Sequence, residues 1–81
     1  MHLTDAVETA KLWFTEIQPD ETILFDMVDP QENIQVCEFI DPYEGSFSMD
    51  GINGFTDLNE FLQKNPFVQN LRIAPRNRKK K

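Results

Sequence analysis

Glu38 is the residue in this 81-residue chain whose sequence surroundings best suit acid–base chemistry. In the alternating run of residues 34–40 it shares one side of a strand with Ile34, Val36 and Ile40. A carboxylate buried on that side loses the water that stabilises its charge, so its neutral, proton-donating form is favoured, as in a general acid. A bulge that turns Glu38 outward, or a sheet end that no helix covers, explains the same pattern without chemistry.

Asp26, Cys37 and Asp50 form a second candidate set, because the expected strand pairing aligns them in one row across three strands. Two carboxylates and a thiolate can bind a divalent metal. However, the flanking negative charges disfavour the thiolate, and hard oxygen and soft sulfur ligands suit different metals. A solvated sheet face is the simpler interpretation, and we predict no metal site and no cofactor.

Other catalytic arrangements cannot be built from these residues. The single histidine, His2, lies next to the first residue, where no third group can orient it for nucleophilic catalysis. Gly51 and Gly54 have neither the spacing nor the following lysine of a phosphate-binding loop. The sequence therefore predicts a protein that is not an enzyme.

The position of these side chains depends on residues 22–52, which alternate in polarity and contain two similar turns. Asp29-Pro-Gln-Glu-Asn33 and Asp41-Pro-Tyr-Glu-Gly45 both fit four-residue hairpin loops, with Asn or Gly in a left-handed last position. Loops at residues 30–33 and 42–45 would pair Asp29 with Ile34 and Asp41 with Ser46. Residues 22–52 are thus predicted to form a three-stranded antiparallel meander.

This pairing assigns every side chain of the meander to one of two faces. The face predicted to be covered carries Ile23, Phe25, Met27, Ile34, Val36, Ile40, Phe47 and Met49, with Glu38 as its one charge. The open face is polar except for Cys37 and four larger apolar residues, Leu24, Val28, Phe39 and Ile52. Contiguous apolar residues on an open face predict a protein-binding or homodimer surface, unless the tail or the flanks of a further strand cover them.

Two helices are expected to cover the apolar face. Residues 3–17 place apolar residues at three- and four-residue spacing, with Thr4 or Asp5 as the N-cap. A second helix is predicted to open at Thr56 and to stop before Pro66, and residues 67–74 alternate as a short fourth strand. The predicted fold is therefore a single α+β domain over residues 1–74, in the order α-β-β-β-α-(β), with both helices on one face.

The element order α-β-β-β-α resembles that of double-stranded-RNA-binding domains. Members of that family carry lysines at the start of the second helix to hold phosphates, whereas the equivalent stretch here, Phe55-Thr-Asp-Leu-Asn-Glu60, is acidic. The resemblance covers the order of the elements and implies no function.

Charge is unevenly divided along the chain. Residues 1–71 hold all 14 acidic residues and only two lysines, a balance of −12, whereas residues 72–81 carry +6. Residues 75–81 are predicted to form a flexible basic tail that can contact nucleic-acid phosphates in a salt-sensitive way. The basic side chains of this tail are Arg76, Arg78, Lys79, Lys80 and Lys81. A solubilising tail, or one that folds back onto the acidic body, is the simpler explanation.

One cysteine cannot form an intramolecular disulfide, and no stretch resembles a signal peptide or a membrane span, so we expect a cytoplasmic protein without membrane contact. The leading hypothesis is a non-enzymatic regulatory or accessory module that binds a partner protein, with its acidic surface favouring a basic partner. One alternative is a nucleic-acid or ribonucleoprotein accessory protein that uses the tail. The other is an acidic mimic of nucleic acid that inhibits a DNA- or RNA-binding protein.

Overall fold

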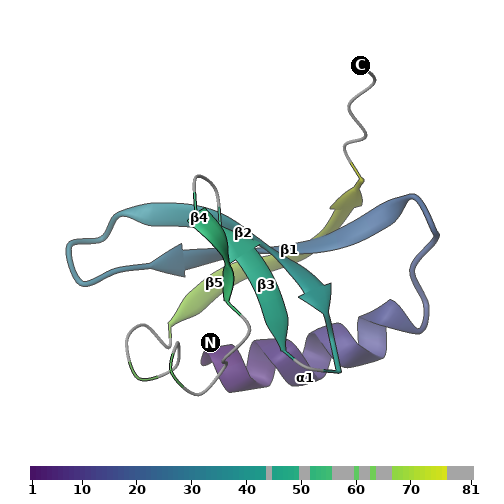
Figure 1. The fold of residues 1–81 in the computed structure, drawn as a ribbon, viewed down its shortest axis with the longest axis horizontal. Coiled ribbons are helices and arrows are strands. Elements are labelled where there is room, and N and C mark those ends of the chain that lie inside the picture. Colours follow the sequence, from purple (N-terminus) through teal and green to yellow (C-terminus); the bar gives the residue numbers. More distant parts are fainter. Residues whose placement is uncertain (44, 50–51, 56–59, 61–62, 64–66, 77–81) are drawn as a thin grey trace.

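The computed structural model describes residues 1–43, 45–49, 52–55, 60, 63 and 67–76, with the backbone alone for 52–55. The elements along this part of the chain are α1 (Leu3–Phe14), β1 (Glu21–Val28), β2 (Ile34–Asp41), β3 (Ser46–Met49), β4 (Ile52–Phe55) and β5 (Val68–Pro75). The five described strands form one antiparallel sheet in the order β4-β3-β2-β1-β5, and α1 lies along one face of it (Figure 1). The protein is therefore an α+β fold with an N-terminal helix.

The predicted meander is present as β1, β2 and β3, and the predicted fourth strand is present as β5. The described sheet has one strand more than predicted, because residues 52–55, which we expected within a strand end and a glycine turn, pair with β3 as β4. This extra strand also departs from the element order that resembles double-stranded-RNA-binding domains. The second predicted helix, from Thr56 to the residue before Pro66, lies outside the described residues except for Glu60 and Gln63.

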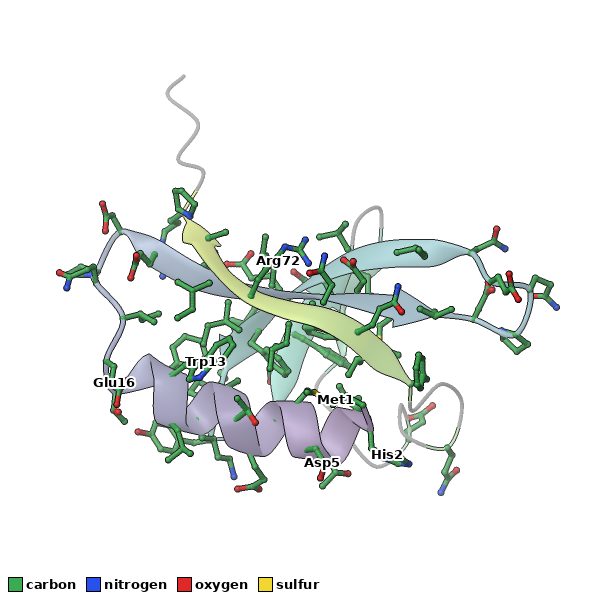
Figure 2. All side chains as sticks on the ribbon, turned by 180° about the vertical axis from the view of Figure 1, so that it is seen from behind. Met1, His2, Asp5, Trp13, Glu16 and Arg72 are labelled. Atoms are coloured by element: carbon green, nitrogen blue, oxygen red, sulfur yellow. The ribbon has the colours of Figure 1, made fainter. Side chains whose placement is uncertain are left out.

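α1 is amphipathic and buries one stripe of side chains against the sheet. The buried residues of this stripe are Leu3, Ala6, Val7 and Ala10. The helix ends at Phe14 and not at residue 17, because a tight turn follows in which the N–H of Ile17 donates to the carbonyl of Trp13 at 3.0 Å. Both of these residues still pack against the core, and Trp13 lies between helix and sheet in Figure 2. In the described part of the chain no helix has the length and apolar character needed to cross a bilayer.

The start of α1 also differs from the prediction. Its N-cap is His2, not Thr4 or Asp5, and no side chain caps it. The residues before the helix are instead paired with the sheet, since the carbonyl of Met1 accepts the N–H of Val68 at 2.9 Å and His2 forms a β-bridge with Phe67. The helix begins directly after this long-range pairing, which the periodicity of the first residues cannot reveal.

The core between α1 and the sheet is centred on three phenylalanine rings, one from each strand of the meander. The ring centroids of Phe25 and Phe39 are 4.4 Å apart, and Phe47 lies 5.7 Å and 6.5 Å from them. Aromatic pairs at such separations contribute about 0.5–1.5 kcal/mol beyond the burial of their surface. The other buried strand residues of this core are Ile23, Met27, Cys37 and Val68.

β2 is turned over relative to the sequence prediction. Val28 lies opposite Ile34, whereas we expected Asp29 in that position. A shift of one residue exchanges the two faces of a strand. As a result Phe39, predicted on the open face, is 1% exposed in the core, and Val36, predicted to be covered, is 44% exposed.

The first hairpin loop causes this shift, because it is one residue longer than expected. The left-handed position belongs to Glu32, at φ 67°, and not to Asn33. The carboxylate of Asp29 accepts the N–H of Asn33 at 2.8 Å, and the N–H of Asp29 donates to the carbonyl of Asn33 at 3.1 Å. These bonds draw Asp29 into the loop, which therefore spans residues 29–33.

The second hairpin follows the prediction at its loop and restores the face of β3. Asp41 lies opposite Ser46, and Gly45 takes the left-handed position at φ 73°. An irregularity at Ile40 then shifts the pairing by one residue, so that Phe39 lies opposite Phe47. The longer loop and this bulge exchange the two faces of β2 and of no other strand in the meander. β1 and β3 keep their predicted apolar faces toward α1.

The charge of Glu38 gives a physical reason for the observed pairing. The predicted pairing would have placed Glu38 beneath the helix and Phe39 in water. Burying a carboxylate without a partner costs several kcal/mol, and exposing a phenylalanine costs about 2–3 kcal/mol. The observed pairing avoids both costs. In exchange it exposes Ile34, Val36 and Ile40, but each of these side chains keeps about half of its surface covered.

Candidate functional site

The face of the sheet opposite α1 carries the candidate site. None of the described elements covers this face, and both views place α1 on the other side (Figures 1 and 2). Its apolar side chains form what we call the open-face patch, which consists of Leu24 and Val28 on β1 and Ile34, Val36 and Ile40 on β2. The two β1 residues are half-buried, whereas Ile34 and Ile40 are 55% and 56% exposed.

The open-face patch is contiguous across β1 and β2. Val28 lies directly opposite Ile34, and the next pairs on this face are Asp26 with Val36 and Leu24 with Glu38. Side chains in such cross-strand pairs have Cβ atoms about 4.5–5.5 Å apart, so Val28 touches Ile34. Leu24 and Val36 are diagonal neighbours, at a distance of about 7–8 Å that long side chains can bridge. The neighbouring strands are polar on this face, since the residues facing Glu38 and Asp26 from β3 and β5 are a serine and a glutamine.

Asp26 and Arg72 form an ion pair beside the patch. The Nη1 atom of Arg72 lies 3.1 Å from one carboxylate oxygen of Asp26, and Nδ2 of Asn70 donates to the other oxygen at 3.1 Å. A left-handed backbone at Asn70, with φ 57°, accompanies the bulge that lets β5 bring both groups to Asp26. Asp26 is 8% exposed and fully partnered, and Arg72 lies on the side of the sheet away from α1 (Figure 2). The positive charge of Arg72 is thus offset within the chain.

Glu38 lies in the middle of β2 on the open face. The predicted pairing, which placed it beneath the helix, is wrong at this position. Glu38 is half-buried, opposite Leu24, and its carboxylate accepts a hydrogen bond from Oγ1 of Thr22 at 2.5 Å. Within the described residues, no basic side chain pairs with Glu38 and no other hydrogen bond reaches it. The acid–base hypothesis depended on burial under the helices, and this position removes that basis.

The predicted row of Asp26, Cys37 and Asp50 is not formed. Asp26 is on the open face and Cys37 is in the core on the other face, while Asp50 lies outside the described residues. Burial raises the pKa of the Cys37 thiol to about 12, with a smaller contribution from the charge of Asp26. The thiol is therefore protonated at neutral pH. Among the residues that the structure describes, no three His, Cys, Asp or Glu side chains are placed to hold a metal ion.

The predicted protein-binding residues are divided between the two faces. Leu24 and Val28 lie in the open-face patch, Phe39 lies in the core, and the side chain of Ile52 is outside the description. The exposed residues that the prediction missed are Ile34, Val36 and Ile40, which we call the β2 aliphatic residues. The charge of Glu38 was the signal in the sequence that could have identified them. A pairing that places Glu38 in solvent also places its neighbours on the same side of β2, the β2 aliphatic residues, in solvent.

Carboxylates lie along β2 and at both of its ends. Glu38 is in the strand, Asp29 and Glu32 are in the first loop, and Asp41 ends the strand. Hydrogen bonds from Asn33, chiefly from its backbone N–H, lower the pKa of Asp29 below 3.8, so this carboxyl is charged at neutral pH. The open-face patch therefore has an acidic surround.

Of the predicted nucleic-acid-binding residues, the structure describes Arg76. Its N–H donates to the carbonyl of Asp20 at 2.6 Å, and its guanidinium donates to the carbonyl of Glu21 at 3.1 Å. Arg76 is exposed beside the start of β1, directly after Pro75 ends β5. The other four predicted residues, Arg78, Lys79, Lys80 and Lys81, lie outside the described residues.

No protein-family model, curated protein or solved structure matches this chain.

Proposed function

We propose that this protein is a small interaction module, with no catalytic activity of its own, that binds a partner protein through the open-face patch. The exposure of the β2 aliphatic residues on a face without a described cover is the observation that carries the proposal. Antiparallel sheets with one open face usually present polar side chains there. Contiguous apolar residues with a polar rim on such a face are typical of interaction sites.

The patch is large enough to form the apolar centre of an interface. Each β2 aliphatic residue leaves about half of its surface in water. Full burial of such a side chain contributes about 1.5–3 kcal/mol, so covering the exposed half contributes roughly 1 kcal/mol. The half-buried Leu24 and Val28 extend this centre onto β1, and the surrounding carboxylates suit the polar rim that interfaces have.

Charge favours a basic protein over other partners. The carboxylates around the patch attract lysine and arginine side chains and increase the rate of association with them. The same charges repel nucleic-acid phosphates and would face one another in a homodimer formed through this patch. A protein that itself binds nucleic acid is one kind of basic partner, as expected for an acidic mimic. Direct contact with nucleic acid through the basic tail is the second candidate function, and it is favoured by the cluster of basic residues after Pro75.

Affinity capture from nuclease-treated extract of the native host, followed by purification of the captured protein, tests the proposal with two matched variants. Ile34→Thr and Ile73→Thr make the same change on strands, at residues that are 55% and 43% exposed. Ile73 is opposite the buried Ile23 and so lies on the α1 side of the sheet. We expect the purified partner to bind wild type and Ile73→Thr equally, and Ile34→Thr about fivefold or more weakly.

Other outcomes contradict the proposal. Equal binding by all three proteins would show that the partner does not use the open-face patch. A parallel capture from untreated extract separates the second candidate: a protein captured only there, and only when residues 77–81 are present, would favour contact with nucleic acid through the tail. A wild-type dimer in sedimentation that Ile34→Thr dissociates would show a second copy of the chain on this face in place of another protein.

A further inference from the structure

The shape of the open-face patch limits what can cover it. It is two strands wide, and strands are about 4.8 Å apart, so its width of about 10 Å equals the diameter of one α-helix. Along β2 it extends from Ile34 to Ile40, a distance of about 20 Å at roughly 3.3 Å per residue. A second sheet would be wider than the patch and would cover the polar residues of β3 and β5.

Backbone hydrogen bonding also favours a helix. The N–H and C=O groups of the strands bond within the plane of the sheet, so an element lying on the face receives no backbone hydrogen bonds from it. An extended peptide buried there would leave its own backbone groups unpaired at a cost of about 1–3 kcal/mol each. A helix satisfies its backbone internally, and α1 already covers the other face of this sheet in that way.

Glu38 indicates which charge an element lying on the open-face patch would need. It interrupts the aliphatic residues of β2 with a carboxylate whose one described hydrogen-bond donor is the neutral hydroxyl of Thr22. An apolar element laid across Glu38 would desolvate this charge, which is costly unless a cation accompanies it. Asp29 and Glu32 add negative charge beyond the Ile34 end of the patch.

We propose that the open-face patch binds a basic amphipathic α-helix of the partner protein, an inference that rests on the proposed function and specifies its partner. The helix lies along β2, with its apolar stripe on Ile34, Val36 and Ile40 and a lysine or arginine beside Glu38. Its contact length of about 20 Å corresponds to about 13 residues at 1.5 Å per residue. Helix α1, the sheet and the partner helix then form three layers.

Synthetic peptides of about 15 residues test this inference. The probe has leucines at three- and four-residue spacing with lysines beside them. One comparison peptide has the same composition with leucine and lysine in strict alternation, and another keeps the leucine spacing but replaces lysine with glutamate. Fluorescence anisotropy with the full chain measures affinity, and amide chemical shifts locate the bound peptide. We expect the probe to bind about tenfold more tightly than either comparison peptide and to shift the amides of β2.

Two charge-matched variants separate contact at Glu38 from general attraction to an acidic protein. Glu38→Gln and Glu16→Gln each remove one negative charge, but Glu16 follows α1 on the other side of the sheet. Glutamine also keeps an acceptor for Thr22 Oγ1. We expect Glu38→Gln to weaken the probe about threefold at low salt and Glu16→Gln to have no measurable effect.

The inference is overturned if the alternating peptide binds as tightly as the probe, if the shifts lie away from β1 and β2, or if both charge variants weaken the probe equally. The proposed function remains in these cases when Ile34→Thr still reduces binding of the purified partner. If Ile34→Thr and Ile73→Thr bind that partner equally, the proposed function fails as well.

Discussion

Replacing Phe39 by leucine tests which face of β2 is buried, and every assignment of the open face depends on that choice. The ring of Phe39 is 1% exposed and makes two aromatic contacts, with centroid distances of 4.4 Å to Phe25 and 6.5 Å to Phe47. Such contacts contribute about 0.5–1.5 kcal/mol each, and leucine fills most but not all of the space. We therefore expect Phe39→Leu to lower the free energy of unfolding by about 1–2 kcal/mol.

Phe67→Leu is the matched control, because Phe67 is 49% exposed at the start of the β5 pairing. We expect it to change stability by no more than about 0.5 kcal/mol, and Val36→Thr to do the same. An 81-residue domain has a stability of roughly 4–12 kcal/mol, so all three variants should fold.

Urea unfolding followed by the fluorescence of Trp13, which packs against the core, measures these differences. At a typical slope of about 1 kcal/mol per molar urea, Phe39→Leu should lower the midpoint by about 1–2 M. Under the pairing first expected from the sequence, Val36 is buried and Phe39 is exposed. Destabilisation by Val36→Thr of more than about 1 kcal/mol, together with a neutral Phe39→Leu, would refute the observed pairing and the open-face patch with it.

Three further predictions follow from the buried and titrating groups. Arg72→Ala removes the charged partner of Asp26, which is 8% exposed, and should cost about 1–3 kcal/mol in urea unfolding; Asp26→Asn in the same chain should recover part of this loss. Burial raises the pKa of Cys37 to about 12 from 9.0, so the folded state retains a proton that the unfolded state loses. Stability relative to Cys37→Ala should therefore fall between pH 9 and 12, by up to about 1.4 kcal/mol per pH unit, and a pH-independent difference would contradict this account. Asp29 has a pKa lowered from 3.8 by the N–H of Asn33, so its stabilising effect is complete above pH 3.8 and is lost as the pH falls through the lower value. Asp29→Asn should remove this part of the acid dependence, and the carboxyl carbon shift in an NMR titration gives the pKa directly.

Local sequence patterns predicted the elements whose signal lies within a few residues. The apolar spacing of Leu3, Ala6, Val7 and Ala10 marks α1, and the alternation after Pro66 marks β5. The start of α1 was predicted wrongly, because it depends on pairing between distant residues. The His2 cap forms because the residues before α1 pair with the chain at Phe67, more than 60 positions away.

The pairing of β2 was wrong for a different reason. This strand has apolar residues on both sides, with Cys37 and Phe39 on one and the β2 aliphatic residues on the other, so alternation alone does not select the buried side. The length of the first hairpin loop decides which side of β2 is buried. The loop is one residue longer than predicted, because Glu32 and not Asn33 takes the left-handed position. A count of apolar residues favours the wrong side, while the position of Glu38 favours the right one. The candidate site could therefore have been found from the sequence only by giving one charge more weight than three aliphatic residues.

The place of β5 at the side of β1 has a consequence for biosynthesis. β1 has β2 on one side and β5 on the other, yet residues 68–75 are made long after residues 21–28. Until they leave the ribosome, the backbone groups on one side of β1 lack partners, and Asp26 has neither Arg72 nor Asn70 beside it. Such late, non-local pairing slows folding and exposes an unpaired strand edge on the nascent chain. A chain that terminates before residue 68 should thus be prone to aggregation.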